Sequence, residues 1–135
     1  PKESLSFNGN TGPYLQYMGA RICSILKKAQ EAGVEKDCST EATSLLTTEA
    51  EWELIKLLGE FPNVIEKAAK NLDPSGLAIY LYDVSKSFSR FYHDCPIINS
   101  GNDKLSGARL ALAESVKTVL QNGLNLILVP FLEQM

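Results

Sequence analysis

The sequence has few of the residues and motifs that mark an enzyme, a metalloprotein or a membrane protein. It contains one histidine and none of the GxSxG, P-loop or GxGxxG motifs. Its three cysteines are far apart and form no CxxC pair, so we predict no metal site and no disulfide framework. No apolar run reaches the ~18 residues that a membrane-spanning helix needs. The sequence therefore predicts neither a catalytic residue nor a membrane span.

The charge balance of the chain is weakly acidic. Thirteen Lys and Arg residues against 16 Asp and Glu residues give a formal net charge of −3. Nonspecific nucleic-acid-binding proteins are usually basic. Any RNA contact would therefore depend on a local basic patch, with contacts to bases providing much of the selectivity.

The length and the apolar content fit one globular domain with a core of its own. The chain has 135 residues, of which 44% are hydrophobic. The lack of a signal peptide and of paired cysteines favours a cytoplasmic protein with reduced cysteines. Because the first residue is Pro1 rather than methionine, we expect a fragment of a longer chain.

The first half of the chain is patterned for helices. Thr11 offers a cap for a helix over residues 13–32, and a short helix is expected near Glu41–Leu46. Thr48 and Glu51 have the spacing of a capping box at the start of another helix. The core stripe of the first helix recurs at helical spacing and comprises Leu15, Met18, Ile22, Ile25, Leu26 and Ala29.

The second half continues the helical pattern, with prolines at the helix starts. A break is expected at Phe61-Pro62, and Pro74 begins a helix that runs to about Tyr92. A last helix is expected over residues 103–122, where Gly123 would kink or cap it. No alternating strand pattern appears, so we predict an all-α bundle of five or six helices.

One face of the first helix carries aromatic and basic side chains. Tyr14, Tyr17, Arg21 and Lys28 stand at i, i+3, i+7 and i+14, about 100° from the core stripe. Rings can stack on unstacked bases while the cations meet phosphates. The alternative is that the tyrosines flank the core with their hydroxyls in water, and the residues alone favour this alternative.

Two further residues need a structural explanation. Arg109 lies at the edge of an apolar stripe, where a buried cation is costly unless it is paired. One hypothesis is a structural bond to Asp94 or to loop carbonyls around Cys95, and the other is direct RNA contact. Trp52 is expected in the core or half-buried, and His93 is expected to be structural or exposed rather than catalytic.

The run Gly9–Tyr17, followed by Arg21 and Ser24, resembles a segment of arginyl-tRNA synthetases. Shorter matches to the same family continue along the chain at Phe61-Pro62, Phe88–Tyr92, Cys95-Pro96, Ala108–Leu110 and Glu133–Met135. The chain thus resembles the C-terminal anticodon-binding (DALR-type) domain of this family. Synthetases of cysteine share a similar helical domain but lack the first motif.

The resemblance implies a division of labour within a longer enzyme. Residues 1–12 would be a linker or turn from the missing catalytic domain, and residues 13–135 the anticodon-binding helical bundle. This fragment would be non-catalytic and would hold no cofactor. The full-length enzyme would use ATP and Mg to join arginine to tRNA(Arg), and the partners would be the anticodon loop and the catalytic domain of the same chain.

The resemblance also implies roles for individual residues. Tyr14 would support the start of the loop, Tyr17 would stack on a base, and Tyr92 would pack against an anticodon base. Met135 would lie near the loop. Weaker candidates for phosphate contacts, chosen by position, are Arg21, Lys28, Lys86 and Arg90. An ordinary solvated helix face is the alternative for the last two.

A competing hypothesis is a helical protein-interaction module. In it, Tyr14, Tyr17 and the apolar tail would dock a partner helix. Salt distinguishes the two, because RNA binding falls steeply with ionic strength and an apolar interface does not.

Overall fold

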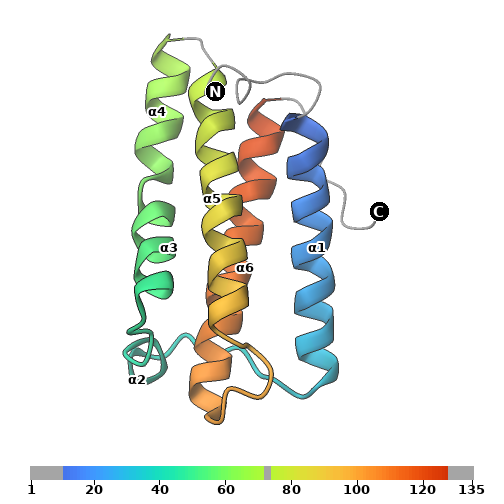
Figure 1. Cartoon of the computed structure of the whole chain (residues 1–135). Coiled ribbons are helices and arrows are strands. Elements are labelled where there is room, and N and C mark those ends of the chain that lie inside the picture. The colour runs from blue at the N-terminus through green and yellow to red at the C-terminus, as the bar shows by residue number, and fades with distance from the viewer. Residues whose placement is uncertain (1–10, 72–73, 128–135) are drawn as a thin grey trace.

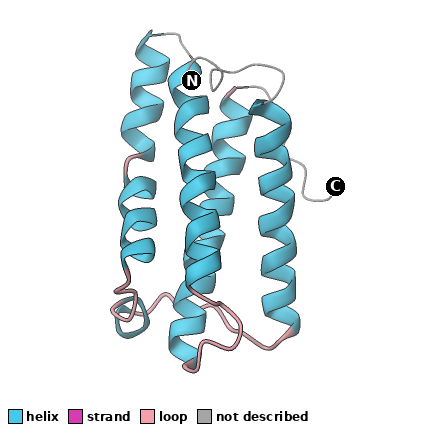
Figure 2. Cartoon of the chain, viewed as in Figure 1, coloured by secondary structure: helices cyan, strands magenta, loops and turns pink. Residues whose placement is uncertain are grey.

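The described part of this computed structural model comprises residues 11–71 and 74–127, and within it every regular element is a helix (Figure 2). This confirms the predicted all-α bundle of five or six helices. In chain order the elements are α1 (Thr11–Glu31), α2 (Thr40–Thr43), α3 (Glu49–Gly59), α4 (Phe61–Asn71), α5 (Ser75–Asp94) and α6 (Asp103–Leu126). The second of these is a single turn.

Three long helices form the body of the bundle. α1, α5 and α6 lie side by side, and α1 and α5 run in the same direction while α6 runs against them (Figure 1). α3 and α4 follow one another along the side of α5 that lies away from α1. The helix α5 therefore contacts α1, α3, α4 and α6, and its contact with α1 is separate from its contact with α3.

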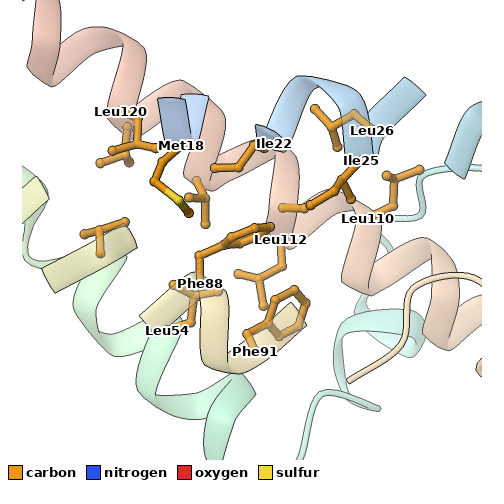
Figure 3. Packing of buried hydrophobic residues seen from close by; sticks show 14 of the residues in the cluster. Met18, Ile22, Ile25, Leu26, Leu54, Phe88, Phe91, Leu110, Leu112 and Leu120 are labelled. Carbon is orange, nitrogen blue, oxygen red and sulfur yellow. The ribbon is translucent and has the colours of Figure 1, made fainter. Parts of the chain in front are cut away.

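The core fills the space between α1, α3, α5 and α6. All six residues of the predicted stripe on α1 are buried, which confirms that prediction. Figure 3 shows Met18 and Ile22 of α1 facing Phe88 of α5. Phe88 and Phe91 are fully buried. Truncating a buried phenylalanine to alanine typically costs about 3–5 kcal/mol, so these rings largely hold α5 in place.

The predicted capping box at the start of α3 is present. The Thr48 hydroxyl accepts a hydrogen bond from the Glu51 amide at 3.2 Å, and the Glu51 carboxylate accepts one from the Thr48 amide at 2.9 Å. The break that follows α3 falls at Glu60, one residue earlier than predicted. Phe61 and Pro62 both lie in the first turn of α4, where amides have no helical acceptor and proline loses nothing.

The predicted cap at Gly123 is wrong, because α6 continues past this residue to Leu126. Gly123 is buried, and a Cβ at this position would lie 2.7 Å from the Leu81 side chain. The glycine therefore permits α6 to approach α5 closely. Similarly, α5 extends to Asp94, two residues beyond the predicted end at Tyr92.

Trp52 does not lie in the core, one of its two predicted places, because 53% of its surface is exposed. The inward positions of α3 next to it are taken by Glu51 and Leu54, both fully buried. Trp52 is rotated about 100° from Glu51 and so points toward solvent.

In the ranges 11–71 and 74–127, no helix is long and apolar enough to cross a membrane.

Candidate nucleic-acid interface

Aromatic side chains from α1 and α5 meet where the two helices lie side by side. We name this strip of surface, which runs from Tyr14 and Tyr82 to Arg21 and Tyr92, the groove. The ring of Tyr14 lies 5.3 Å from the ring of Tyr82, with an angle of 47° between their planes. Burial raises the pKa of the Tyr14 phenol, the nearby Tyr82 raises it further, and Arg21 opposes the change. Tyr14 therefore stays protonated at neutral pH, as a ring with a hydrogen-bond donor at its edge.

Tyr92 lies further along the same groove. Its ring is stacked with that of Phe88, with centroids 6.1 Å apart and planes 8° apart. Because Phe88 is fully buried, the core fixes the orientation of Tyr92. The Arg21 guanidinium lies 5.8 Å from the centroid of the Tyr92 ring. The predicted residues Tyr14, Arg21 and Tyr92 are thus brought together, although 78 residues separate the first from the last.

A small apolar cavity adjoins Tyr92. Its volume is about 260 Å³, and it opens between α1 and the loop that follows α5. The lining residues are Ile25, Ala29, Tyr92, Pro96, Ile97 and Ile98. Pockets for drug-sized ligands measure about 300–1,000 Å³. The cavity, which we name the apolar slot, suits a single planar ring better than a larger ligand.

The cations of the groove contact rings rather than carboxylates. The Lys86 ammonium lies 5.6 Å from the centroid of the Tyr82 ring, and the Arg21 guanidinium lies 5.8 Å from that of Tyr92. Lys28 is exposed in the last turn of α1. Within residues 11–71 and 74–127, none of these three cations forms an ion pair with a carboxylate. The groove therefore keeps its positive charge in an acidic chain.

Arg90, the fourth cation proposed from the sequence, lies on the other side of α5. It pairs with Glu53, with Glu49 at 3.1 Å and with Asp94 at 3.6 Å. The hydrogen bond to Glu49 and the charge of Glu53 raise the pKa of the Arg90 guanidinium. Because three carboxylates already neutralise Arg90, we leave it out of the interface.

Arg109 lies behind the apolar slot and is buried. Its Nε donates to the Glu51 carboxylate at 2.7 Å, and its Nη1 donates to the carbonyl of Pro96 at 2.8 Å. The loop carbonyl was among the expected partners, whereas Asp94 bonds to His93 and Arg90 instead. The Arg109 guanidinium thus fixes the loop that supplies one wall of the slot, without lining it.

The remaining predicted residues are placed as follows. Tyr17 lies on α1 with 51% of its surface exposed. Met135 and the motif residues before Thr11 lie outside the described residues. His93 is at the end of α5 with its side chain 88% exposed and bonded to Asp94 at 2.9 Å. No group of three or more His, Cys, Asp or Glu residues suited to a metal occurs in the described part of the chain.

Sequence reasoning missed Tyr82 and Glu51. Tyr82 precedes Lys86 by four positions, the same spacing that separates Tyr17 from Arg21, and that spacing was the available signal. Glu51 had already been explained by the capping box, so nothing in the pattern indicated a second partner.

Comparison with known proteins accounts for nearly the whole chain. Residues 15–135 match the family described as DALR anticodon binding domain. The arginine–tRNA ligase of Treponema denticola is 59% identical over 138 residues, which cover 100% of this chain and 23% of that protein. The arginine–tRNA ligase of Borrelia hermsii is 43% identical over 134 residues, covering 99% of this chain and 23% of that protein.

Solved structures agree with the sequence match. The arginyl-tRNA synthetase of Thermus thermophilus superposes with a TM-score of 0.80 at 32% identity, covering 96% of this chain and 22% of that chain. The chain spans about 23% of the length of the curated relatives and matches their C-terminal part. The chain belongs to the family of DALR anticodon binding domains.

Proposed function

We propose that this chain binds the anticodon loop of tRNA(Arg) as part of an arginine–tRNA ligase, and positions that tRNA for a catalytic domain of the same protein. The observation that carries the proposal is the groove between α1 and α5. There Tyr92 lines the apolar slot, the un-neutralised cation Arg21 lies over the Tyr92 ring, and Tyr14 lies about two turns of α1 before Arg21. Family membership and the names of the relatives support the same function.

ATP and Mg²⁺ would be used by the full-length enzyme, and we assign them to the catalytic domain. The part of this chain that the structure describes offers no group of carboxylates, histidines or cysteines fit to hold a metal. The sequence also has no P-loop. None of Cys23, Cys38 and Cys95 forms a disulfide, which supports a cytoplasmic location, and we also propose that location.

The groove would hold unstacked bases mainly by stacking. In nucleic-acid-binding proteins generally, replacing an aromatic residue that stacks on a base by alanine costs about 1–3 kcal/mol of binding free energy. Tyr17 presents an exposed ring, and Tyr92 forms the wall of the slot. In the free chain Arg21 covers the Tyr92 ring. On RNA binding, a base would replace the guanidinium on that ring, and Arg21 would turn to the adjoining phosphate.

The test is a titration of a fluorescent tRNA(Arg) anticodon stem-loop at low salt, compared with the same stem-loop carrying a changed second anticodon base. We expect the wild-type chain to prefer the correct loop. Tyr92→Ala and Tyr17→Ala should each weaken binding about five- to 150-fold, the equivalent of one lost stack. Both should reduce the preference as well.

Trp52→Ala is the matched control, because Trp52 is 53% exposed, much like Tyr17 at 51%, but lies on α3 outside the groove. This variant should bind RNA normally. Equal binding of both loops would contradict base recognition in the groove. Binding that does not weaken with added salt would favour the competing protein-interaction module.

A further inference from the structure

A second aromatic and basic cluster lies in the same groove, nearer the N-termini of α1 and α5. Tyr82 is half-buried, with its ring 5.3 Å from that of Tyr14, and Lys86 lies 5.6 Å over the Tyr82 ring. The two tilted rings form an aromatic corner, and the ammonium stands at its edge. This cluster repeats, from different residues, the combination of ring and cation made by Tyr92 and Arg21.

The two clusters are too far apart to hold one base. Tyr14 and Arg21, which mark the clusters on α1, are seven residues apart, or about 10 Å along a helix that rises 1.5 Å per residue. Tyr82 and Tyr92, which mark them on α5, are ten residues apart, or about 15 Å. Successive nucleotides of a stacked strand are only about 3.4 Å apart. Ligands at the two clusters must therefore be different nucleotides.

We propose that Tyr14, Tyr82 and Lys86 form a second nucleotide-binding position, which takes a nucleotide of the RNA loop other than the one held at Tyr92. The base stacks in the corner between Tyr14 and Tyr82, and the Lys86 ammonium contacts its phosphate. Tyr82 is thus a nucleotide-contacting residue rather than only a packing residue. This inference rests on the proposed function, because it assumes that the groove binds RNA.

The charges around Lys86 fit a phosphate contact. Lys86 is exposed and, within the described ranges, has no carboxylate partner. Four positions further along α5, Arg90 is held by three carboxylates. One helix therefore carries a cation ready for an anion from outside and another that is already neutralised.

The experiment combines protein variants with a scan of the RNA. Stem-loops with a single abasic nucleotide, placed in turn at each loop position, are titrated against the wild-type chain, Tyr82→Ala and Tyr92→Ala. Each variant should weaken binding of the intact loop at least about fivefold. At one abasic position, Tyr82→Ala and the wild-type chain should bind with equal affinity, because the base that Tyr82 contacts is already missing. For Tyr92→Ala this equality should appear at a different abasic position.

Three controls keep the result interpretable. Tyr82→Phe keeps the ring and should bind nearly as the wild type does. Lys86→Gln, at an exposed site, should lower the slope of log affinity against log salt by about 0.7, the value of one phosphate of a single strand. Lys86→Gln tests the proposal independently if Tyr82→Ala fails to fold, which thermal melting by circular dichroism shows.

Each outcome decides between named alternatives. The second position is refuted if Tyr82→Ala folds and binds normally, or if both variants respond to the same abasic nucleotide. A normal salt slope in Lys86→Gln likewise refutes the phosphate contact. If Tyr92→Ala also binds normally, the failure lies with the proposed function and not only with the second position.

Discussion

The two sides of α5 use the same residue types for different purposes. On the side of α1, Lys86 and Arg21 lie over tyrosine rings and have no carboxylate partner among the described residues. On the side of α3, Arg90 bonds to three carboxylates. A basic residue is therefore available to a phosphate only where its neighbours leave its charge unpaired. The net charge of the whole chain does not show this.

The tyrosines of α5 also have different roles on its two sides. Tyr80 and Tyr82 are two positions apart and therefore point to nearly opposite sides of α5. Tyr80 is buried toward α3 and α4, where its hydroxyl donates to the Leu57 carbonyl at 2.6 Å and its ring stacks with Phe61. Tyr82 meets Tyr14 in the groove. One tyrosine stabilises the bundle, and the other is available for a ligand.

The largest effect is expected at the buried pair of Arg109 and Glu51. Replacing Arg109 by Leu leaves the Glu51 carboxylate buried without its cation, which typically costs about 3–5 kcal/mol. Urea unfolding followed by circular dichroism measures this loss. The exposed pair of Lys36 and Glu114, 2.6 Å apart, is the control. Its variant Lys36→Gln should leave the free energy of unfolding nearly unchanged, because an exposed ion pair adds little to stability. Equal costs for the two variants would contradict the structural role of Arg109.

A smaller effect is expected on the α3 side at high pH. Burial raises the pKa of Tyr80 to about 12, from an ordinary value of 10.0. The unfolded chain then releases this proton at lower pH than the folded chain does. Stability should therefore fall as the pH rises from about 10 to 12, whereas below 10 this group adds no pH dependence.

Tyr80→Phe tests this assignment. It should cost about 1 kcal/mol at neutral pH, the net worth of the hydrogen bond to Leu57. It should also remove part of the alkaline loss of melting temperature. Tyr82→Phe, on the groove side, is the comparison: it keeps the Tyr80 phenol, so the alkaline loss due to Tyr80 should remain. An unchanged alkaline profile in Tyr80→Phe would show that Tyr80 is not the group responsible.

The fold was predictable because its signals are local. The stripe from Leu15 to Ala29 repeats at helical spacing, and Thr48 and Glu51 form their capping box within one turn. Both can be read without knowing the tertiary structure. Gly123 was misjudged because its role depends on Leu81, 42 positions away in the chain.

The candidate site was only partly predictable for the same reason. One helix of the groove was predicted from Tyr14, Tyr17 and Arg21, which share a face of α1. The pairing of that face with Tyr82 depends on how α5 packs beside α1, which no spacing in the sequence expresses. Glu51 was likewise explained by its own turn, and its long-range bond to Arg109 appears only in the folded chain.

The most direct test of the account compares one cation from each side of α5. Arg21→Gln and Arg90→Gln remove the same charge, so the two chains are matched in net charge. We measure the affinity for the anticodon stem-loop over a range of salt concentrations. We expect the slope of log affinity against log salt to be lowered by about 0.7 in Arg21→Gln and to be unchanged in Arg90→Gln. Equal reductions in the two variants would contradict this expectation, because RNA would then respond to total charge and not to the groove.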